Sequence, residues 1–289
     1  MNHYEAAVTA SGAGSLAGEF QRVDRVSDPG RFVACLERLS SIPFFRDYKS
    51  GSRAALGLRP GDRVLEVGCG LGLDLAALGA DVGPRGLAVG LDASRVMLER
   101  AGKGRAEAAG RGQSLSLAFA AGDALDLPFA AASFHACRVD RTLQHVVDPF
   151  RALAEMARVT RPGGRVLAVE PDWGSYLLDA ADPEAAGIVA RTWRDGFPSG
   201  RAGRTLVRGM AACGLTDIAV TPRTFVLRDF ATADAIYDIE RSVAGAVAAG
   251  SLTQERAAAF LAGLVQADAR GCFFSSLTFF EVMGRRPGG

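Results

Sequence analysis

Arg63-Val-Leu-Glu-Val-Gly-Cys-Gly-Leu-Gly72 is the stretch of this chain that is most informative about its fold. It begins with a short apolar run, which is typical of a buried strand. It ends in Gly68, Gly70 and Gly72, which allow the backbone to turn sharply and to approach a ligand closely. Residues 71–78 then have a helical pattern. A strand, a glycine turn and a helix in this order predict a nucleotide-type site, in which amides at the helix N-terminus face an anionic group.

The spacing of the glycines indicates which ligand the turn would hold. A dinucleotide fingerprint is G-x-G-x-x-G, whereas this chain has G-x-G-x-G and carries Leu73 at the sixth position. No lysine follows, as it would in a phosphate-binding P-loop. Glu66 lies two residues before the first glycine, where a carboxylate would repel a pyrophosphate and would suit an ammonium group. The pattern therefore disfavours a nicotinamide oxidoreductase, and the chain also has no Tyr-x-x-x-Lys pair.

The motif E-V-G-C-G-L-G (residues 66–72) resembles the first motif of class I S-adenosylmethionine-dependent methyltransferases. A plain structural turn is the alternative interpretation of these residues. From about residue 59 to residue 170 the chain is also similar to the small-molecule methyltransferases related to ubiquinone and menaquinone biosynthesis enzymes, the type 11 group. The motifs L-x-H-x-x-D-P (143–149) and R-x-x-R-P-G-G-R (158–165) carry this second resemblance. It implies that S-adenosyl-L-methionine is the cofactor and S-adenosyl-L-homocysteine the product, with the methionine part held by the glycine turn.

Two carboxylates that follow later strands are expected to bind the nucleoside of the cofactor. Asp92 ends the second apolar run, residues 87–91, and a carboxylate there can accept hydrogen bonds from ribose hydroxyls; a helix N-cap is the alternative. Asp123 lies in G-D-A-x-x-L-P-F (122–129), which resembles the methyltransferase motif whose acid binds the adenine amino group; an Asp-centred turn is the alternative. The predicted cofactor-binding residues are Tyr48, Glu66, Gly68, Gly70, Gly72, Asp92, Ala93, Met97, Asp123, Ala124 and Val139.

The segments after the glycine turn alternate between strand and helix, which predicts an α/β fold. We expect a Rossmann-like, seven-stranded, mostly parallel sheet with helices on both faces. Residues 1–58 are predicted to form an N-terminal helical cap, and residues 59–230 and 271–289 the methyltransferase core. Residues 231–270 are an insertion of two predicted helices between the last two strands. The insertion is expected to pack with the N-terminal helices as a lid that excludes water; a dimer contact is the alternative.

Composition and charge exclude several classes of protein. A net charge of +1 offers no electrostatic basis for binding nucleic acid or an anionic membrane. No apolar run approaches the ~20 residues of a membrane span, and the N-terminus lacks the pattern of an export signal. Five scattered cysteines without a C-x-x-C pair, with only three histidines, argue against a disulfide framework or a structural zinc site. We therefore expect a cytoplasmic protein with a small-molecule substrate and no nucleic-acid or membrane partner; a homodimer is left open.

Methyl transfer from a sulfonium is an in-line displacement, in which the protein mainly aligns the acceptor, the methyl carbon and the sulfur. His145 follows the fourth strand and is the candidate general base, with a pKa suited to neutral pH; the alternative is that it only shapes the pocket. Glu170 and Asp172 lie at the end of the fifth strand, and these candidate catalytic acids could orient His145 or bind a substrate amine or hydroxyl. No metal site is predicted, because the chain lacks the set of acids and an amide with which catechol-type methyltransferases hold magnesium.

These resemblances, together with the candidate site residues, imply an S-adenosylmethionine-dependent methyltransferase that methylates oxygen, carbon or nitrogen of a small apolar or aromatic metabolite, in secondary metabolism. Trp173, Tyr176 and Trp193 are candidates for the walls of an aromatic site, or for lid packing. Two further hypotheses stay open. One is a cyclase or another non-methylating enzyme on the methyltransferase scaffold, because a fold does not determine a function. The other is a cofactor-binding partner protein without catalysis.

Overall fold

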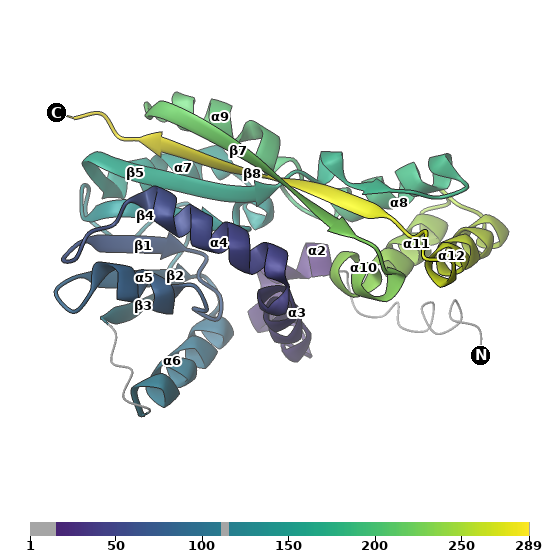
Figure 1. Cartoon of the computed structure of the whole chain (residues 1–289), viewed down its shortest axis with the longest axis horizontal. Helices are drawn as coiled ribbons and strands as arrows, with labels where there is room; N and C mark the ends of the chain where they lie inside the picture. The colour runs from purple at the N-terminus through teal and green to yellow at the C-terminus, as the bar shows by residue number, and fades with distance from the viewer. Residues whose placement is uncertain (1–15, 111–115, 289) are drawn as a thin grey trace.

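The computed structural model describes residues 16–110 and 116–288, and one twisted sheet forms its centre (Figure 1). Its strands are β1 (Arg63–Val67), β2 (Leu87–Asp92), β3 (Leu117–Ala121), β4 (Phe134–Asp140), β5 (Thr160–Pro171), β6 (Leu177–Leu178), β7 (Thr216–Leu227) and β8 (Ser275–Arg285). The order is β3-β2-β1-β4-β5-β8, with β7 on the other edge of β8. Strands from β3 to β5 pair in parallel, whereas β8 is antiparallel to both β5 and β7. This arrangement confirms the predicted Rossmann-like α/β fold.

The described part of the chain has one strand more than the seven predicted. β6 pairs with Ser275 and Ser276 at the start of β8. The pairing of β8 with β5 ends where Pro171 faces Phe279, so the backbone groups of β8 beyond that point need another partner. Two residues are too short a pattern for sequence periodicity to reveal.

Helices cover both faces of the sheet because successive side chains of a strand point to opposite faces. In β1, Val64 packs with one pair of helices and Leu65 with another pair, in a second core. The first pair is α4 (Pro43–Leu56) and α5 (Leu75–Val82), and the second is α7 (Pro149–Val159) and α9 (Ala202–Ala212). In Figure 1, α4 crosses in front of the sheet and α7 lies behind it. A further helix, α6 (Arg95–Gly110), packs against β3 and β2.

The glycine turn joins β1 to α5 through three backbone positions in the left-handed region. Gly68, Gly70 and Gly72 have φ values of 71°, 51° and 68°, which favour glycine. A Cβ atom at Gly68 would also collide with the Thr142 side chain. A helix cannot contain these conformations, so α5 begins at Leu75 and not at residue 71, where the sequence predicts it.

The chain adds helices before β1 and between β7 and β8. Those before β1, besides α4, are α2 (Leu16–Glu19), the 3-10 helix η1 (Phe20–Arg25) and α3 (Gly30–Ser41). Those before β8 are α10 (Phe230–Tyr237), α11 (Ile239–Ala248) and α12 (Gln254–Ala269). The first of the two helices predicted in the insertion is divided into α10 and α11, because Asp238 adopts a left-handed conformation with φ of 51°.

The added helices contact one another and the core. α10 contacts α3, and α11 packs against α8 (Pro183–Asp195), which follows β6 (Figure 1). Residues 1–15 of the predicted cap lie outside the described residues. None of the helices within 16–110 and 116–288 has the length and apolar character needed to cross a membrane.

Candidate active site

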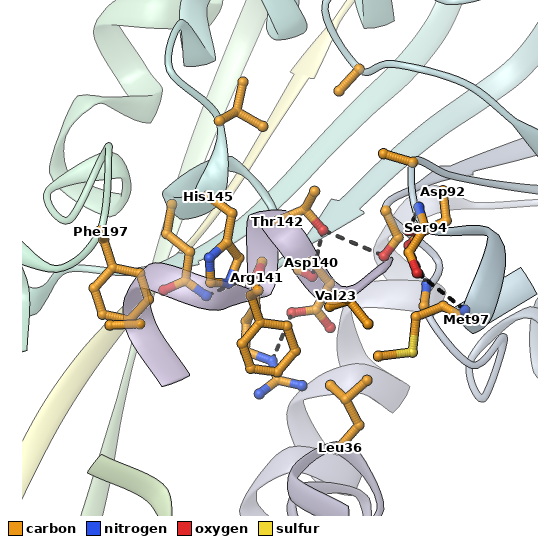
Figure 2. Close-up of a pocket in the computed structure, with 18 of the residues that line it drawn as sticks. Val23, Leu36, Asp92, Ser94, Met97, Asp140, Arg141, Thr142, His145 and Phe197 are labelled. Atoms are coloured by element: carbon orange, nitrogen blue, oxygen red, sulfur yellow. Dashed lines mark hydrogen bonds and ion pairs between the residues drawn. The ribbon is translucent and has the colours of Figure 1, made fainter. Parts of the chain in front are cut away.

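A cavity of about 650 Å³ is lined by residues that follow the carboxyl ends of β1, β2 and β4, the edge at which sheets of this kind bind ligands. Figure 2 shows Asp92 and Met97 at one end of the cavity. It shows His145 and Phe197 at the other end, and Arg141 between the two ends. We call the first the carboxylate end (Asp92, Ala93, Met97, Asp123 and Ala124) and the second the aromatic end (Phe20, His145, Trp173, Trp193, Phe197 and Tyr237).

At the carboxylate end, Asp92 ties the glycine turn to the end of β2. Its Oδ2 accepts a hydrogen bond from the amide of Gly70 at 2.7 Å, and its Oδ1 from the amide of Ser94 at 2.8 Å. Burial raises the pKa of Asp92, and these amides oppose the shift. Asp123 accepts from the amide of Leu125 at 2.9 Å. Both carboxylates line the cavity and keep acceptor sites that these backbone bonds do not use.

A buried ionic network lies beneath the middle of the cavity. Arg138 is fully buried on β4 and donates to Glu66 and, at 2.7 Å, to Asp140. The hydroxyl of Tyr48 donates to Asp140 Oδ1 at 2.9 Å. Burial raises the pKa of Glu66, and the guanidinium of Arg138 opposes this shift. The network joins α4 to β1 and β4, and it presents Asp140 to the cavity.

The short helix η2 (Leu143–His145) brings His145 to the aromatic end. Glu170 on β5 holds this turn, because its carboxylate accepts from the amides of Thr142 at 2.7 Å and Leu143 at 2.6 Å. The His145 ring lies 5.1 Å from that of Phe20, between ring centroids. Burial, with a smaller effect of the nearby Arg141 guanidinium, lowers the pKa of His145 to about 3. His145 is therefore neutral at pH 7.

Aromatic rings from α8, from the turn after it and from α10 meet around Trp173 of η3 (Trp173–Ser175). The Trp173 ring stacks on Phe197 with centroids 5.0 Å apart, and its Nε1 donates to Gln144 Oε1 at 2.7 Å. Trp193 of α8 and Tyr237 of α10 both stand edge-on to Trp173, at 5.5 Å and 5.7 Å. These rings give the cavity an apolar, flat-walled end that suits a planar molecule.

The 3-10 helix η1 covers the carboxylate end of the cavity. Asp24 accepts a hydrogen bond from the hydroxyl of Ser94 and others from the amides of Arg95 at 2.9 Å and Val96 at 3.3 Å. It thus caps the N-terminus of α6 from a distant part of the chain. Val23, beside it, lines the cavity and is buried.

Comparisons with known proteins agree with this geometry. The family model described as a methyltransferase domain matches residues 65–168. An uncharacterised 37.1 kDa protein in transposon Tn4556 of Streptomyces fradiae is 37% identical over 255 residues, which are 88% of this chain and 71% of that protein. A demethylmenaquinone methyltransferase of Beutenbergia cavernae is 39% identical over 167 residues, 56% of this chain and 61% of that enzyme. The chain thus spans less than two thirds of that enzyme.

Solved structures share the fold. The crystal structure of the YcgJ protein from Bacillus subtilis superposes with a TM-score of 0.57 at 20% identity, over 84% of this chain and all of that one. The chain belongs to the class I S-adenosylmethionine-dependent methyltransferases.

The carboxylate end of this methyltransferase fits the family's cofactor, S-adenosylmethionine. Its two carboxylates have free acceptor sites, which a ribose or an adenine amine can satisfy. Gly70 leaves its backbone open to the cavity, since the nearest atom to a Cβ placed there would be Leu36 Cδ1 at 3.5 Å. In the middle, Arg141 Nε is buried and makes no hydrogen bond among the described residues, although it lies 3.8 Å from Asp140 Oδ1. The guanidinium thus keeps donors that suit an anionic group of a ligand.

The structure places four of the predicted cofactor contacts of this methyltransferase behind the cavity wall. Tyr48 and Glu66 are bonded to Asp140 and Arg138 in the ionic network. Gly72 turns the chain, and a side chain there would meet the Phe119 ring. Val139 is fully buried in the core, because alternate residues of β4 face α7. The predicted contacts that line the cavity are Gly68, Gly70, Asp92, Ala93, Met97, Asp123 and Ala124.

The structure shows the surroundings of the three candidate catalytic residues, and the expectation that Glu170 orients His145 stays a prediction. The pKa of His145 is not suited to neutral pH, because the ring is buried beside a cation. Glu170 does not reach the cavity, since backbone amides occupy its carboxylate. Asp172 is also turned away: it accepts from Arg204 Nε at 2.8 Å and from the amide of Gly174 at 3.1 Å. Both carboxylates position neighbouring turns, one bearing His145 and the other Trp173.

Two cavity residues were missed. Asp140 ends β4 as Asp92 ends β2, so the same strand-end rule would have found it. Asp24 has no such signal in the sequence, because it caps a helix that begins 71 residues later. Among residues 16–110 and 116–288, no three or more His, Cys, Asp or Glu side chains are grouped so as to hold a metal ion.

Proposed function

We propose that this methyltransferase transfers a methyl group from S-adenosylmethionine to a small, apolar or aromatic metabolite. The observation that carries the proposal is the continuity of one cavity from the carboxylate end to the aromatic end (Figure 2). In-line displacement needs the acceptor and the methyl donor in one enclosed space, with the reacting atoms aligned. Which atom of the acceptor is methylated, oxygen, carbon or nitrogen, is for product analysis to decide.

The carboxylate end is proposed to hold the cofactor, which supplies an electrophilic methyl group when bound. Asp92 would accept hydrogen bonds from the ribose hydroxyls, and Asp123 one from the adenine amino group. Met97 would pack against the adenine ring. The turn at Gly68 and Gly70 would lie along the methionine part, where these glycines leave the backbone accessible.

His145 is proposed to orient the acceptor as a neutral imidazole rather than to act as a general base. Its Nδ1 is buried without a hydrogen-bond partner among the described residues. A neutral imidazole can accept a hydrogen bond from an acceptor hydroxyl. A base with a pKa of about 3 is poorly matched to removing a proton at neutral pH. Alignment by the cavity walls would then supply most of the rate enhancement.

The described part of the N-terminal cap, residues 16–58, and the insertion, residues 231–270, are proposed to act together as a lid on the core. Support comes from both sides of the cavity, which is lined by Val23 of η1 and by Ile236 and Tyr237 of α10. α10 also contacts α3. A lid of this kind would exclude water while the acceptor and the cofactor are bound.

Product analysis by mass spectrometry tests the proposed reaction. The purified protein is incubated with S-adenosylmethionine and a panel of phenols, polyketides and amines. We expect S-adenosylhomocysteine and a product one methyl group heavier than its acceptor. Conversion of an acceptor at unchanged mass, with S-adenosylmethionine retained, would instead identify a non-methylating enzyme such as a cyclase. Cofactor binding without conversion of any compound, at any mass, would contradict the proposed function for this panel.

A further inference from the structure

The aromatic end of the cavity contains polar atoms that nothing in the described residues satisfies. Tyr237 Oη and Trp193 Nε1 are both buried without a hydrogen-bond partner. The side chains are deeply enclosed, because Tyr237 is 2% exposed and Trp193 is 4% exposed. A buried donor left unpaired destabilises a fold. Both residues line the same cavity, so a ligand in its aromatic end is the candidate partner for the two donors.

The chemistry of these two groups restricts the ligand. An indole N–H is a donor only, so a hydrogen-bond acceptor alone can satisfy Trp193. Burial raises the pKa of Tyr237 well above its usual value, so its hydroxyl keeps its proton and can donate. The aromatic rings around the two donors stack best on a flat π-system. The ligand that fits is therefore planar and carries oxygen atoms that accept hydrogen bonds.

The two donors are held in place before any ligand arrives. Tyr237 is the last residue of α10, and the left-handed Asp238 that follows it turns the chain into α11. The Trp193 and Tyr237 rings make angles of 84° and 85° with Trp173. Trp173 is itself fixed by its hydrogen bond to Gln144. Donors on packed rings of this kind lose little conformational entropy when they bind.

We propose that Tyr237 and Trp193 select the acceptor by donating hydrogen bonds to carbonyl-type oxygen atoms on a planar aromatic molecule. The inference rests on the proposed function only in treating the aromatic end as the acceptor site. It goes further, because aromatic walls alone would accept a hydrocarbon as well as a ketone. The two residues come from α8 and α10, so acceptor selectivity would reside in helices outside the parallel sheet.

Binding of a matched pair of probes distinguishes selection by the two hydrogen-bond donors from acceptance by the aromatic walls alone. 9-Fluorenone and fluorene have the same flat skeleton and differ in one carbonyl oxygen. The chain has only two tryptophans, Trp173 and Trp193, and both line the aromatic end, so their fluorescence reports on this site. The titration is made with S-adenosylhomocysteine present and repeated without it. We expect the parent protein to bind fluorenone about three- to tenfold more tightly than fluorene, as one or two net hydrogen bonds imply.

Two variants assign that preference to named atoms. Tyr237→Phe removes one hydroxyl and should bring fluorenone binding close to that of fluorene, while fluorene binding stays unchanged. Trp193→Phe should reduce the preference for fluorenone over fluorene. The affinity of the same variant for fluorene measures the effect of the smaller ring by itself. The matched control is Tyr176→Phe, because the Tyr176 hydroxyl is also buried and unpaired, 4.8 Å ring to ring from Tyr237, but Tyr176 does not line the cavity. The control should bind both probes as the parent does.

Equal affinities of the parent for the two probes would overturn the inference. So would a Tyr237→Phe variant that keeps the ketone preference, or one that loses both probes equally while its melting curve matches the parent's. These results are independent of the proposed reaction, because probe binding requires no methyl transfer. Failure of the proposed function would appear as an absence of methylated product, whatever the probes do.

Discussion

Asp92 has two tasks that its surroundings make compatible. It holds the glycine turn through the amide of Gly70 and the start of α6 through the amide of Ser94. Its remaining acceptor sites face the cavity. The helix-cap alternative and the ribose role are therefore not exclusive, since one carboxylate can accept up to about four hydrogen bonds.

Asp92→Ala should weaken the binding of S-adenosylhomocysteine by about 1.5–3 kcal/mol, the contribution of hydrogen bonds to a charged group. Isothermal titration calorimetry measures the change. The matched control is Asp126→Ala, which removes an exposed carboxylate outside the cavity lining and should leave the affinity unchanged. An unaltered affinity in a folded Asp92→Ala protein would remove the ribose assignment.

His145 should make the stability of the protein depend on pH in the acid range. Its folded pKa of about 3 lies below the ordinary value of 6.5, so the unfolded chain binds more protons between these two pH values. The free energy of unfolding should therefore fall as the pH falls from about 6.5 toward 3, by at most about 1.4 kcal/mol per pH unit from this group. His145→Gln should remove this part of the slope, measured by urea unfolding at several pH values.

The same variant separates two roles of His145. If the side chain orients the acceptor, His145→Gln should lower turnover severalfold and leave the affinity for S-adenosylhomocysteine unchanged. Parent-like turnover would reduce His145 to a residue that only shapes the pocket. An unchanged slope of stability against pH would show that the imidazole is not held neutral by burial.

At the scale of elements, the ionic network fastens α4 to the sheet. Arg138 extends from β4 and is fully buried. Its ion pairs with Glu66 and Asp140 offset the free energy lost when the guanidinium is removed from water. Lys49 of α4 joins the same network, because its Nζ lies 2.6 Å from Asp74 Oδ2. The network thereby also fixes the segment that leads into α5.

Arg138→Leu should destabilise the protein by about 3–5 kcal/mol, because it leaves buried carboxylates without a cation. Urea unfolding followed by circular dichroism measures the loss. Arg256→Leu is the comparison, because it breaks an ion pair with Asp182 at the surface, and it should cost much less. Similar losses in both variants would contradict a special role for the buried network.

The contact between η1 and α6 is the second junction between elements that the site depends on. Asp24→Ala removes the acceptor for Ser94 and for the first amides of α6, and loss of a cap costs about 1 kcal/mol. We expect weaker binding of S-adenosylhomocysteine and faster tryptic cleavage at Arg22 and Arg25. Asp28→Ala is the control, because the Asp28 carboxylate accepts from the amide of Gly30 within its own turn. Equal cleavage rates in the two variants would show that Asp24 does not hold η1 down.

At the scale of the whole molecule, the cavity is bounded by three parts of the chain that are distant in sequence. η1 precedes the sheet, the glycine turn and η2 belong to it, and α10 is inserted before its last strand. A ligand that fills the cavity would contact all three, and its binding free energy would add to the stability of their arrangement.

S-adenosylhomocysteine at a hundredfold excess over its dissociation constant should stabilise the protein by about 2.7 kcal/mol. Differential scanning calorimetry should show one transition that moves to higher temperature with ligand concentration. The Asp92→Ala variant at the same ligand concentration should show a smaller shift. Two separate transitions, with only one responding to the ligand, would mean that the added helices melt independently of the core.

Much of the fold can be predicted from local pattern alone. The order of strands and helices from β1 to β5 follows from apolar runs and glycine turns, because each depends on neighbouring residues. The division of the inserted helix at Asp238 and the two-residue strand β6 could not be foreseen. The helix is divided by a single residue in the left-handed conformation. β6 forms because it pairs with the start of β8, about a hundred residues further along the chain.

The local chemistry of the chain was enough to predict the methyltransferase family and the glycine turn, because each motif lies within a few consecutive residues. It also singled out Asp92 and Asp123, which line the cavity and whose binding of the cofactor stays a prediction. Which side chains reach the cavity was not readable in this way. Tyr48 and Glu66 turn to partners on other strands, Glu170 turns to the backbone beneath His145, and Tyr237 arrives from an inserted helix. Burial and long-range pairing determine these positions, and both arise only when distant segments pack together.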